Sequence, residues 1–264
     1  MRLRLPFTNR PPLVSVIRLQ GAIGVGSRGM SDAGMAAPIE RAFRKGKPVA
    51  VALQINSPGG SPTQSALIAA RIRRLSAEKE VPVFAFVEDV AASGGYWLAT
   101  AGDEIFVDDN SIAGSIGVIS ASFGLHEFIG KHGIERRVHT AGQSKSFMDP
   151  FRPEKPEDVE RLKALQEVIH GNFIRQVKAR RGSKLDDGTE LFTGDIWVGQ
   201  QAVDVGLADG VGHLIPTMKA RFGDKTRFAV HGPRRGLLKR LGAEAMNGAV
   251  GAVEDRAMWA RFGL

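Results

Sequence analysis

The sequence predicts an α/β fold with a mostly parallel β-sheet flanked by helices, and three observations support this prediction. Apolar runs of strand length alternate with amphipathic stretches of helix length between residues 13 and 107, which is the pattern of β-α-β units. One run, residues 48–55 (PVAVALQI), is almost continuously apolar, as expected for a strand covered on both faces. Two of the runs lead into glycine-rich turns, and sites in such sheets collect at the carboxyl ends of strands.

The elements follow in order from their local sequence. Residues 13–19 contain enough β-branched residues to predict a strand, and residues 31–45 carry apolar residues at helical spacing. The strand at 48–55 runs into the turn NSPGG, after which Ser61 and Pro62 have the residue types of a helix N-cap and first helical position. That helix places Leu67, Ile68, Ile72 and Leu75 on one side.

The third strand, residues 81–87 (VPVFAFV), is predicted to end a few residues before Ser93. A short helix from Gly94 and a strand at residues 104–107 follow it. Residues 156–181 form the clearest helix, with acidic residues at its start and basic residues at its end. We found no internal repeat or low-complexity linker, so we predict one domain over residues 1–232 and a basic amphipathic helical tail over residues 233–264.

Composition limits the functional classes. The 264 residues are 43% hydrophobic and 24% charged, which is ordinary for a globular protein. The absence of cysteine excludes disulfides, thiolate nucleophiles and cysteine-bound zinc. The net charge is +8, and residues 217–264 contribute ten basic and four acidic residues, or 10 − 4 = +6. The basic residues are interleaved mainly with leucine, alanine and glycine, which is not the pattern of a nucleic-acid groove with stacking aromatic residues, so we predict no nucleic-acid partner.

The distribution of apolar segments predicts where in the cell the protein lies. No apolar run reaches the ~18 residues that span a bilayer, and no apolar segment follows the first charges as in a secretory signal. We therefore expect a cytoplasmic protein without a transmembrane anchor. The tail is expected to pack on a neighbouring subunit, and the alternative is peripheral contact with the anionic inner face of the cell membrane.

The stretch VAASGGYW presents Ser93 between small residues. An acyl-transfer enzyme needs a nucleophilic oxygen, a base and backbone N–H donors for the oxyanion. The N–H of Gly94 follows Ser93 directly, and Gly59 or Gly60 in the SPGG turn could bring the second donor because glycine allows close backbone approach. A plain turn at the end of a strand is the alternative for either glycine pair alone.

The base is not evident from the residues alone. None of the six histidines (His126, His132, His139, His170, His213 and His231) has an orienting carboxylate close in sequence, although a Ser-His-Asp triad is not excluded. A lysine can also act as the base when desolvation favours its neutral form. Lys145 is a candidate because small and apolar residues surround it in AGQSKSFMDPF.

Five segments in one order, INSPGGS, AASGGYWLA, IAGSIGVI, AGQSKSFMDPF and FTGDIWVGQQAVDVGLADGVG, resemble the signal peptide peptidase A family of serine peptidases. The resemblance covers roughly residues 14–213. It implies a Clp/crotonase-like fold and a Ser-Lys dyad made of Ser93 and Lys145, 145 − 93 = 52 residues apart. The implied oxyanion donors are Gly59, with Gly60 as a second option, and Gly94. The resemblance implies no cofactor and no metal.

Two alternatives to a Ser-Lys peptidase remain open. A Clp-type peptidase would use a histidine base, for which His126 is nearest after Ser93, although the polar face of a short helix also explains this residue. Ser115 is interpreted as a residue that helps a turn or forms a hydrogen bond near the site. Ser144 or Ser146 is expected either to orient the lysine ammonium or to form a local hydrogen bond within the loop, and none of the three is interpreted as a nucleophile. A non-catalytic scaffold or binding module with the same fold is the alternative function.

The resemblance also implies partners. We expect peptide substrates, namely signal-peptide-like or other apolar segments bound in an extended conformation. We also expect a homo-oligomer. Members of the family that are bound to membranes carry a transmembrane anchor, which is not visible in this sequence.

Overall fold

The computed structural model describes residues 11–24, 29–142, 145–232 and 256–264. The elements are β1 (Leu13–Gln20), α1 (Asp32–Arg44), β2 (Ala50–Ser57), α2 (Pro62–Lys79), β3 (Val83–Ala92), α3 (Gly94–Ala99), β4 (Glu104–Val107), β5 (Ile112–Gly114), α4 (His126–Lys131), α5 (Pro156–Arg181), the 3₁₀ turn η1 (Gly182–Lys184), β6 (Ile196–Val198), α6 (Gln200–Asp204), β7 (Gly210–Val211), α7 (Leu214–Phe222) and β8 (Arg227–His231). The predicted tail falls mostly outside the described residues, and its described end is helical over residues 256–260.

The chain forms two compact units. The sheet unit comprises the described residues up to Ile116 and from Ile174 onward, and the insert unit is Gly117–Phe173. All eight strands lie in the sheet unit, whereas the insert unit contains α4 and the first part of α5.

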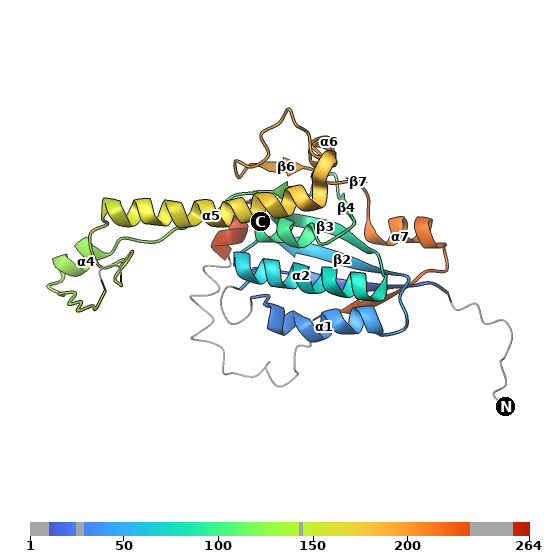
Figure 1. Ribbon diagram of the computed structural model, residues 1–264, viewed down its shortest axis with the longest axis horizontal. Coiled ribbons are helices and arrows are strands. Elements are labelled where there is room, and N and C mark those ends of the chain that lie inside the picture. Colours follow the sequence, from blue (N-terminus) through green and yellow to red (C-terminus); the bar gives the residue numbers. More distant parts are fainter. Residues whose placement is uncertain (1–10, 25–28, 143–144, 233–255) are drawn as a thin grey trace. The chain divides into compact units, whose positions relative to one another are not determined.

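The sheet unit is organised around one β-sheet (Figure 1). Its main path runs β6-β5-β3-β2-β1-β8, and β4 and β7 extend it from the first part of β3. All the neighbouring pairs are parallel except β5 and β6. This mostly parallel sheet with flanking helices confirms the fold class predicted from the sequence.

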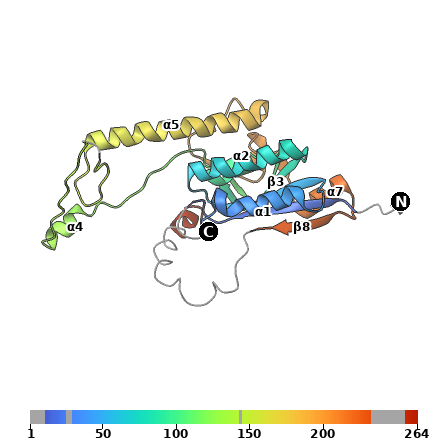
Figure 2. The same ribbon diagram turned by 60° about the horizontal axis from the view of Figure 1, so that its bottom comes forward.

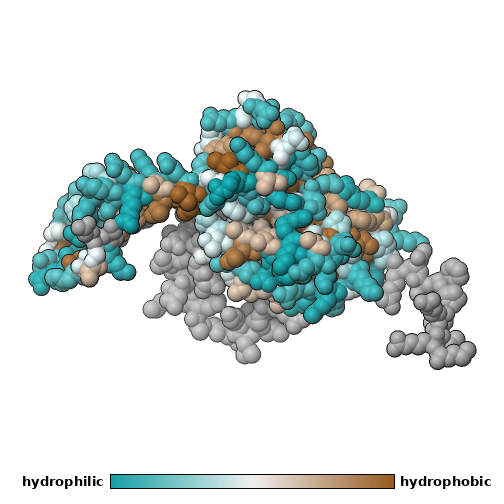
Figure 3. All heavy atoms as spheres, in the orientation of Figure 1, coloured by the Kyte–Doolittle hydropathy of each residue, from teal (hydrophilic) through white to brown (hydrophobic). Residues whose placement is uncertain are grey.

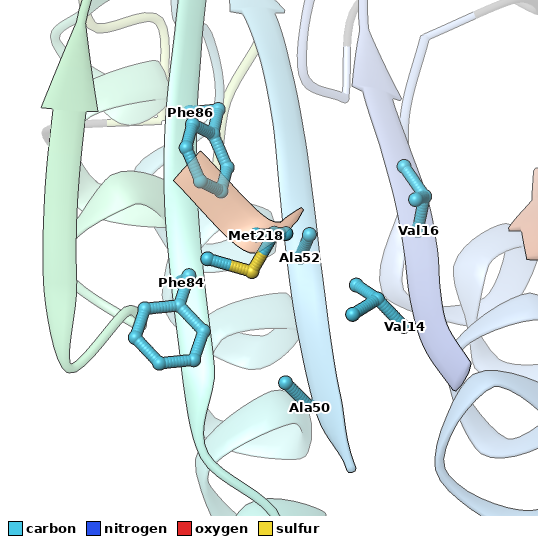
Figure 4. Close-up of a cluster of buried hydrophobic side chains, with 7 residues drawn as sticks. All are labelled: Val14, Val16, Ala50, Ala52, Phe84, Phe86 and Met218. Atoms are coloured by element: carbon cyan, nitrogen blue, oxygen red, sulfur yellow. The ribbon is translucent and has the colours of Figure 1, made fainter. Parts of the chain in front are cut away.

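The central strands are apolar on both faces because both faces are covered. One face carries a cluster in which Met218 of α7 packs on alternate residues of three strands (Figure 4). The strand residues of this cluster are Val14, Val16, Ala50, Ala52, Phe84 and Phe86. The intervening residues, such as Ile17 and Leu53, are fully buried and point to the other face, along which α1 and α2 lie side by side (Figures 1 and 2).

Most predicted elements agree with the structure to within two residues, and α5 and β4 have the predicted bounds. The third strand differs in a way that bears on function. It was expected to end at Val87, but β3 continues to Ala92, the residue immediately before Ser93. Pairing with β2 shifts register between Ile55 and Ser57, so β3 carries a bulge and then pairs with β5.

The surface is largely hydrophilic on the face seen in Figure 3, with apolar residues showing around β6. In β6, Ile196 and Val198 are 43% and 39% exposed. Within the residues that the structure describes, no helix combines the length and the apolar character needed to cross a membrane.

Candidate active site

Ser93 occupies the junction between β3 and α3, where a strand passes directly into a helix. Its backbone angles are φ 52° and ψ −122°, a region that side-chain-bearing residues rarely adopt and that costs about 1–3 kcal/mol. The Ser93 N–H donates to the Gly114 carbonyl at 2.9 Å, and its carbonyl accepts from the Trp97 N–H at 3.0 Å. These bonds to β5 and α3 hold the strained turn.

Helix α3 is itself firmly anchored. Every one of its six residues is buried. The Tyr96 hydroxyl donates to the Leu207 carbonyl at 2.8 Å, and burial raises the pKa of the Tyr96 phenol well above its usual value. Because the phenol stays neutral, it keeps the proton that it donates. The helix therefore gives Ser93 a fixed support.

The SPGG turn after β2 is held by the chain that follows β1. The Ile23 N–H donates to the Gly59 carbonyl at 2.8 Å, and the Ser61 N–H donates to the Ile23 carbonyl at 2.7 Å. Gly60 lies between these two bonds and forms a parallel bridge with Ile23. Since Ile23 binds the residues on both sides of Gly60, the N–H and the carbonyl of Gly60 point away from Ile23.

The SPGG turn and the Ser93 turn lie against each other. A Cβ placed on Gly59 would stand 2.9 Å from both the Gly94 nitrogen and the Ser93 Cβ. A Cβ on Gly94 would stand 3.4 Å from the Gly60 nitrogen and 2.4 Å from the Ser65 hydroxyl. Only glycine fits at these two contacts. The structure therefore brings together four of the five site residues predicted from the sequence: Ser93, Gly59, Gly60 and Gly94.

The backbone N–H groups of these glycines are not equivalent. The Gly59 N–H donates to the Ser57 hydroxyl at 3.3 Å. Among the described residues, the N–H groups of Gly60 and Gly94 have no recorded acceptor. Two unpaired donors beside a serine hydroxyl are the arrangement that binds an oxyanion. Sequence reasoning did not identify Ser57, and its only signal was a small polar residue at the end of an apolar strand.

Lys145 belongs to the insert unit and is exposed. Its N–H donates to the Gly142 carbonyl at 3.3 Å, and the neighbouring Ser146 hydroxyl accepts from Arg152 at 3.4 Å. Ser144, the other serine beside the lysine, lies outside the described residues.

Asp149 fixes the loop four residues beyond the lysine. Its carboxylate accepts the Phe151 N–H at 3.0 Å and pairs with Arg136 at 3.2 Å. The Phe151 bond is the main cause that lowers the pKa of Asp149.

The other candidates have local explanations. Ser115 is buried with a φ of 51°, and its N–H donates to the Asp195 carbonyl at 2.7 Å, which agrees with the turn-forming role expected for it. His126 begins α4 in the insert unit. The described parts of the chain contain no group of three or more His, Asp and Glu side chains that could hold a metal ion.

One histidine of the sheet unit has a carboxylate partner. His213 lies 2.8 Å from Asp108, and this hydrogen bond lowers the pKa of Asp108 to about 2. Phe106 pairs with Phe86, so Asp108, two residues further along, lies level with Glu88. Glu88 is five positions before Ser93, which corresponds to roughly 15 Å along β3. This His-Asp pair is therefore not adjacent to Ser93.

Comparison with known proteins gives a consistent result. Residues 76–220 match the profile of peptidase family S49. The chain is 32% identical to the chloroplastic serine protease SPPA of Arabidopsis thaliana over 80% of its own length and 32% of that protein. It is also 32% identical to protease 4 of Haemophilus influenzae over 79% of its own length and 34% of that protein.

A higher identity, 48%, is found with a Brucella melitensis protein named Na(+)/H(+) antiporter NhaA. The similarity covers 95% of this chain but 37% of that protein. The chain thus spans about a third of the length of each of these three relatives.

Proposed function

The chain belongs to peptidase family S49, and from this premise we propose that it is a serine endopeptidase that uses Ser93 as nucleophile and Lys145 as general base. The observation that carries the proposal is the Ser93 turn itself. A serine held at φ 52° directly between a buried strand and a buried helix is costly to maintain. Such strain is typical of a nucleophile presented at a strand-to-helix turn.

The proposed reaction has two halves. The neutral Lys145 amine takes the proton from the Ser93 hydroxyl as the oxygen bonds to the carbonyl carbon of a peptide. The carbonyl oxygen becomes negative and is held by the two N–H groups without a recorded acceptor, those of Gly60 and Gly94. The carbon–nitrogen bond then breaks, and the lysine ammonium returns the proton to the leaving amine. Water repeats these steps on the acyl-enzyme and releases the second product.

The geometry favours Gly60 over Gly59 as the oxyanion donor from the SPGG turn. The Gly59 N–H is committed to Ser57, whereas Gly60 directs its N–H away from Ile23. For Gly59 we propose a steric role, since the turn contacts Ser93 and Gly94 where a side chain would collide.

The substrate class that we propose is an extended, apolar peptide segment of the signal-peptide type. The backbone donors of Gly60 and Gly94 support the extended form, because they recognise a main-chain carbonyl and not a side chain. The relatives named as proteases in Arabidopsis and Haemophilus support the peptidase class.

The test compares wild type with Ser93→Ala and Lys145→Ala in hydrolysis of a fluorogenic apolar peptide over a series of pH values. Both substitutions are expected to lower kcat by at least about 1,000-fold. The wild-type rate should rise with pH, because only the neutral amine accepts a proton. Ser76→Ala and Lys131→Ala serve as controls, since each replaces the same residue type within the same unit as its counterpart, and both should retain full activity.

A serine-directed fluorophosphonate gives an independent measurement. It should label Ser93 in wild type and fail to label Ser93→Ala, as read by mass spectrometry. Activity that survives both substitutions would refute the dyad. A wild-type protein that neither cleaves peptides nor forms an adduct would favour the alternative of a non-catalytic binding module.

A further inference from the structure

Ser57 is a buried polar residue at the end of β2 that the proposed chemistry leaves without a role. It has no exposed surface, and its hydroxyl makes two hydrogen bonds. It donates to the Gly21 carbonyl at 2.8 Å and accepts the Gly59 N–H at 3.3 Å. A buried hydroxyl that satisfies two backbone groups at once fixes the local backbone conformation.

The first bond joins Ser57 to a residue 36 positions earlier in the sequence, and the second joins it to a residue two positions later. Gly21 follows β1, and its own N–H donates to the Asn56 carbonyl at 2.9 Å. The Ser57 hydroxyl therefore ties the SPGG turn to the end of β1, and Ile23 binds the Gly59 carbonyl and the Ser61 N–H of the same segment. The Gly59 carbonyl and the Gly60 N–H belong to one peptide group, which the Ile23 N–H holds through that carbonyl. The Ser57 hydroxyl holds the preceding peptide group through the Gly59 N–H, and glycine at both positions leaves these bonds to set the backbone angles of the turn.

The orientation of this turn decides which amide is available. With the Gly59 N–H drawn toward Ser57, the next N–H, that of Gly60, is left on the side of Gly94. Without the Ser57 hydroxyl, the buried Gly59 N–H would have to find another acceptor, and rotation of the turn is the simplest way to do so.

Ser57 also touches the other half of the site. A Cβ on Gly95 would stand 2.3 Å from the Ser57 carbonyl oxygen and 3.2 Å from the Ser57 Cβ. The start of α3 therefore packs on the same residue that holds the SPGG turn. Ser57 lies between the segments that carry both unpaired N–H groups.

We propose that Ser57 is a positioning residue for the oxyanion site: its hydroxyl binds the Gly59 N–H and the Gly21 carbonyl, and so keeps the Gly60 N–H directed at the substrate carbonyl oxygen. This role rests on the proposed peptidase function. The residue touches no reacting atom, so its effect on catalysis passes through Gly60.

The test measures kcat and KM for Ser57→Ala with the fluorogenic peptide. Misplacing one oxyanion donor is expected to lower kcat by about 10- to 100-fold. KM should stay within about twofold, because the donor acts mainly on the charge that develops in the transition state. The pH dependence should not change, since the base is untouched. Affinity for a peptide aldehyde, which forms a tetrahedral oxyanion on Ser93, should fall by a similar factor.

Ser76→Ala is the matched control. Ser76 is also buried, and its hydroxyl donates to the Val81 carbonyl at 2.8 Å at the far end of α2. This variant should lose stability as Ser57→Ala does but keep kcat within twofold of wild type. Ser57→Cys retains a weak hydrogen-bonding group of similar size and should give an intermediate kcat, which provides a readout if Ser57→Ala folds poorly.

The outcomes separate the two proposals. If wild type is active and Ser57→Ala has the kcat of Ser76→Ala, or loses activity only through KM, the role of Ser57 is refuted and the peptidase function stands. If wild type neither cleaves peptides nor reacts with the fluorophosphonate, the peptidase function is refuted, and the role of Ser57 falls with it.

Discussion

The Ser93 turn and the Lys145 loop carry the two halves of the proposed dyad, yet they are held in different ways. The residues on both sides of Ser93, from Val90 to Ala92 and from Gly94 to Ala99, are buried, and glycines allow backbone to touch backbone. The Lys145 loop is largely exposed or half-buried, and side-chain hydrogen bonds through Asp149 and Arg152 hold it.

Because of this difference, we expect the two regions to tolerate amino-acid substitutions to different extents. The proposed nucleophile and oxyanion donors depend on close packing inside one unit, where an added methyl group collides with fixed backbone. The proposed base lies on an exposed loop, where the described residues leave room for a side chain at Gly142. We therefore expect substitutions in the two regions to differ in both activity and stability.

The largest effect is expected from a pair of glycine substitutions. Gly59 and Gly142 have similar positive φ angles, 103° and 94°. A Cβ on Gly59 meets the Ala92 oxygen at 2.8 Å, whereas a Cβ on Gly142 meets no atom of the described residues within 4 Å. Gly59→Ala should lower the free energy of unfolding by about 3–4 kcal/mol, the sum of strain and overpacking. Gly142→Ala should lower the free energy of unfolding by about 1 kcal/mol, because it adds backbone strain but no collision.

Urea denaturation followed by circular dichroism measures both values. Gly59→Ala should also reduce kcat at least 100-fold, because the SPGG turn must move away from Ser93. Equal losses of stability for the two variants would contradict the view that packing distinguishes the two regions.

Much of the fold, but less of the site, was predictable from sequence. Long elements such as α5, with 26 residues, have a periodic pattern that identifies them. The strands β5, β6 and β7 have three residues or fewer, which is too short for a pattern. Tertiary pairing forms them, so they were missed. The division at residues 117 and 173 has no signal in composition.

The site shows the same limit. The motifs predicted Ser93 and the two glycine turns only in combination, because a plain turn at the end of a strand also explains either glycine pair alone. The distinction between Gly59 and Gly60 depends on a hydroxyl bonded to a carbonyl 36 residues earlier, and no local pattern records such a bond. Similarly, the strain at Ser93 follows from the extension of β3 to Ala92, which the apolar run up to Val87 did not predict.

The second prediction concerns ion pairs in the two units. In the sheet unit, Asp209 binds Arg181 at 2.6 Å, and the Arg181 side chain is 2% exposed. Asp209→Asn removes the negative charge that pairs with this buried guanidinium and should lower the free energy of unfolding by about 2 kcal/mol. In the insert unit, Glu135 and Arg137 pair at the surface with both side chains mostly exposed. Glu135→Gln should therefore have little effect on stability.

The Asp209 carboxylate should also make the stability of the fold depend on pH. Burial alone would raise the pKa of Asp209, but hydrogen bonds from Arg181 and Lys184 lower it below its usual value. The group then binds its proton more weakly in the folded state than in the unfolded state. Its stabilisation is complete above the unfolded pKa of about 3.9 and is lost as pH falls below that value.

Urea midpoints measured from pH 7 to pH 3 check this sign. The stability difference between wild type and Asp209→Asn should be constant from pH 7 to about pH 5 and shrink toward pH 3. A difference that grows on acidification would contradict the assigned direction.

The smallest expected effect tests whether Ser93 is strained for function. Glycine tolerates φ 52° with ψ −122°, whereas alanine keeps the strain of serine. Ser93→Gly should therefore be about 1 kcal/mol more stable than Ser93→Ala, after allowance for the greater chain entropy of unfolded glycine. Glu80 is the control, since its angles, φ 53° and ψ 39°, lie in the ordinary left-handed region. The difference in stability between Glu80→Gly and Glu80→Ala should therefore be smaller than that between Ser93→Gly and Ser93→Ala. If thermal unfolding shows no advantage for Ser93→Gly, the turn is not strained, and the buried packing around Ser93 serves stability and not presentation of a nucleophile.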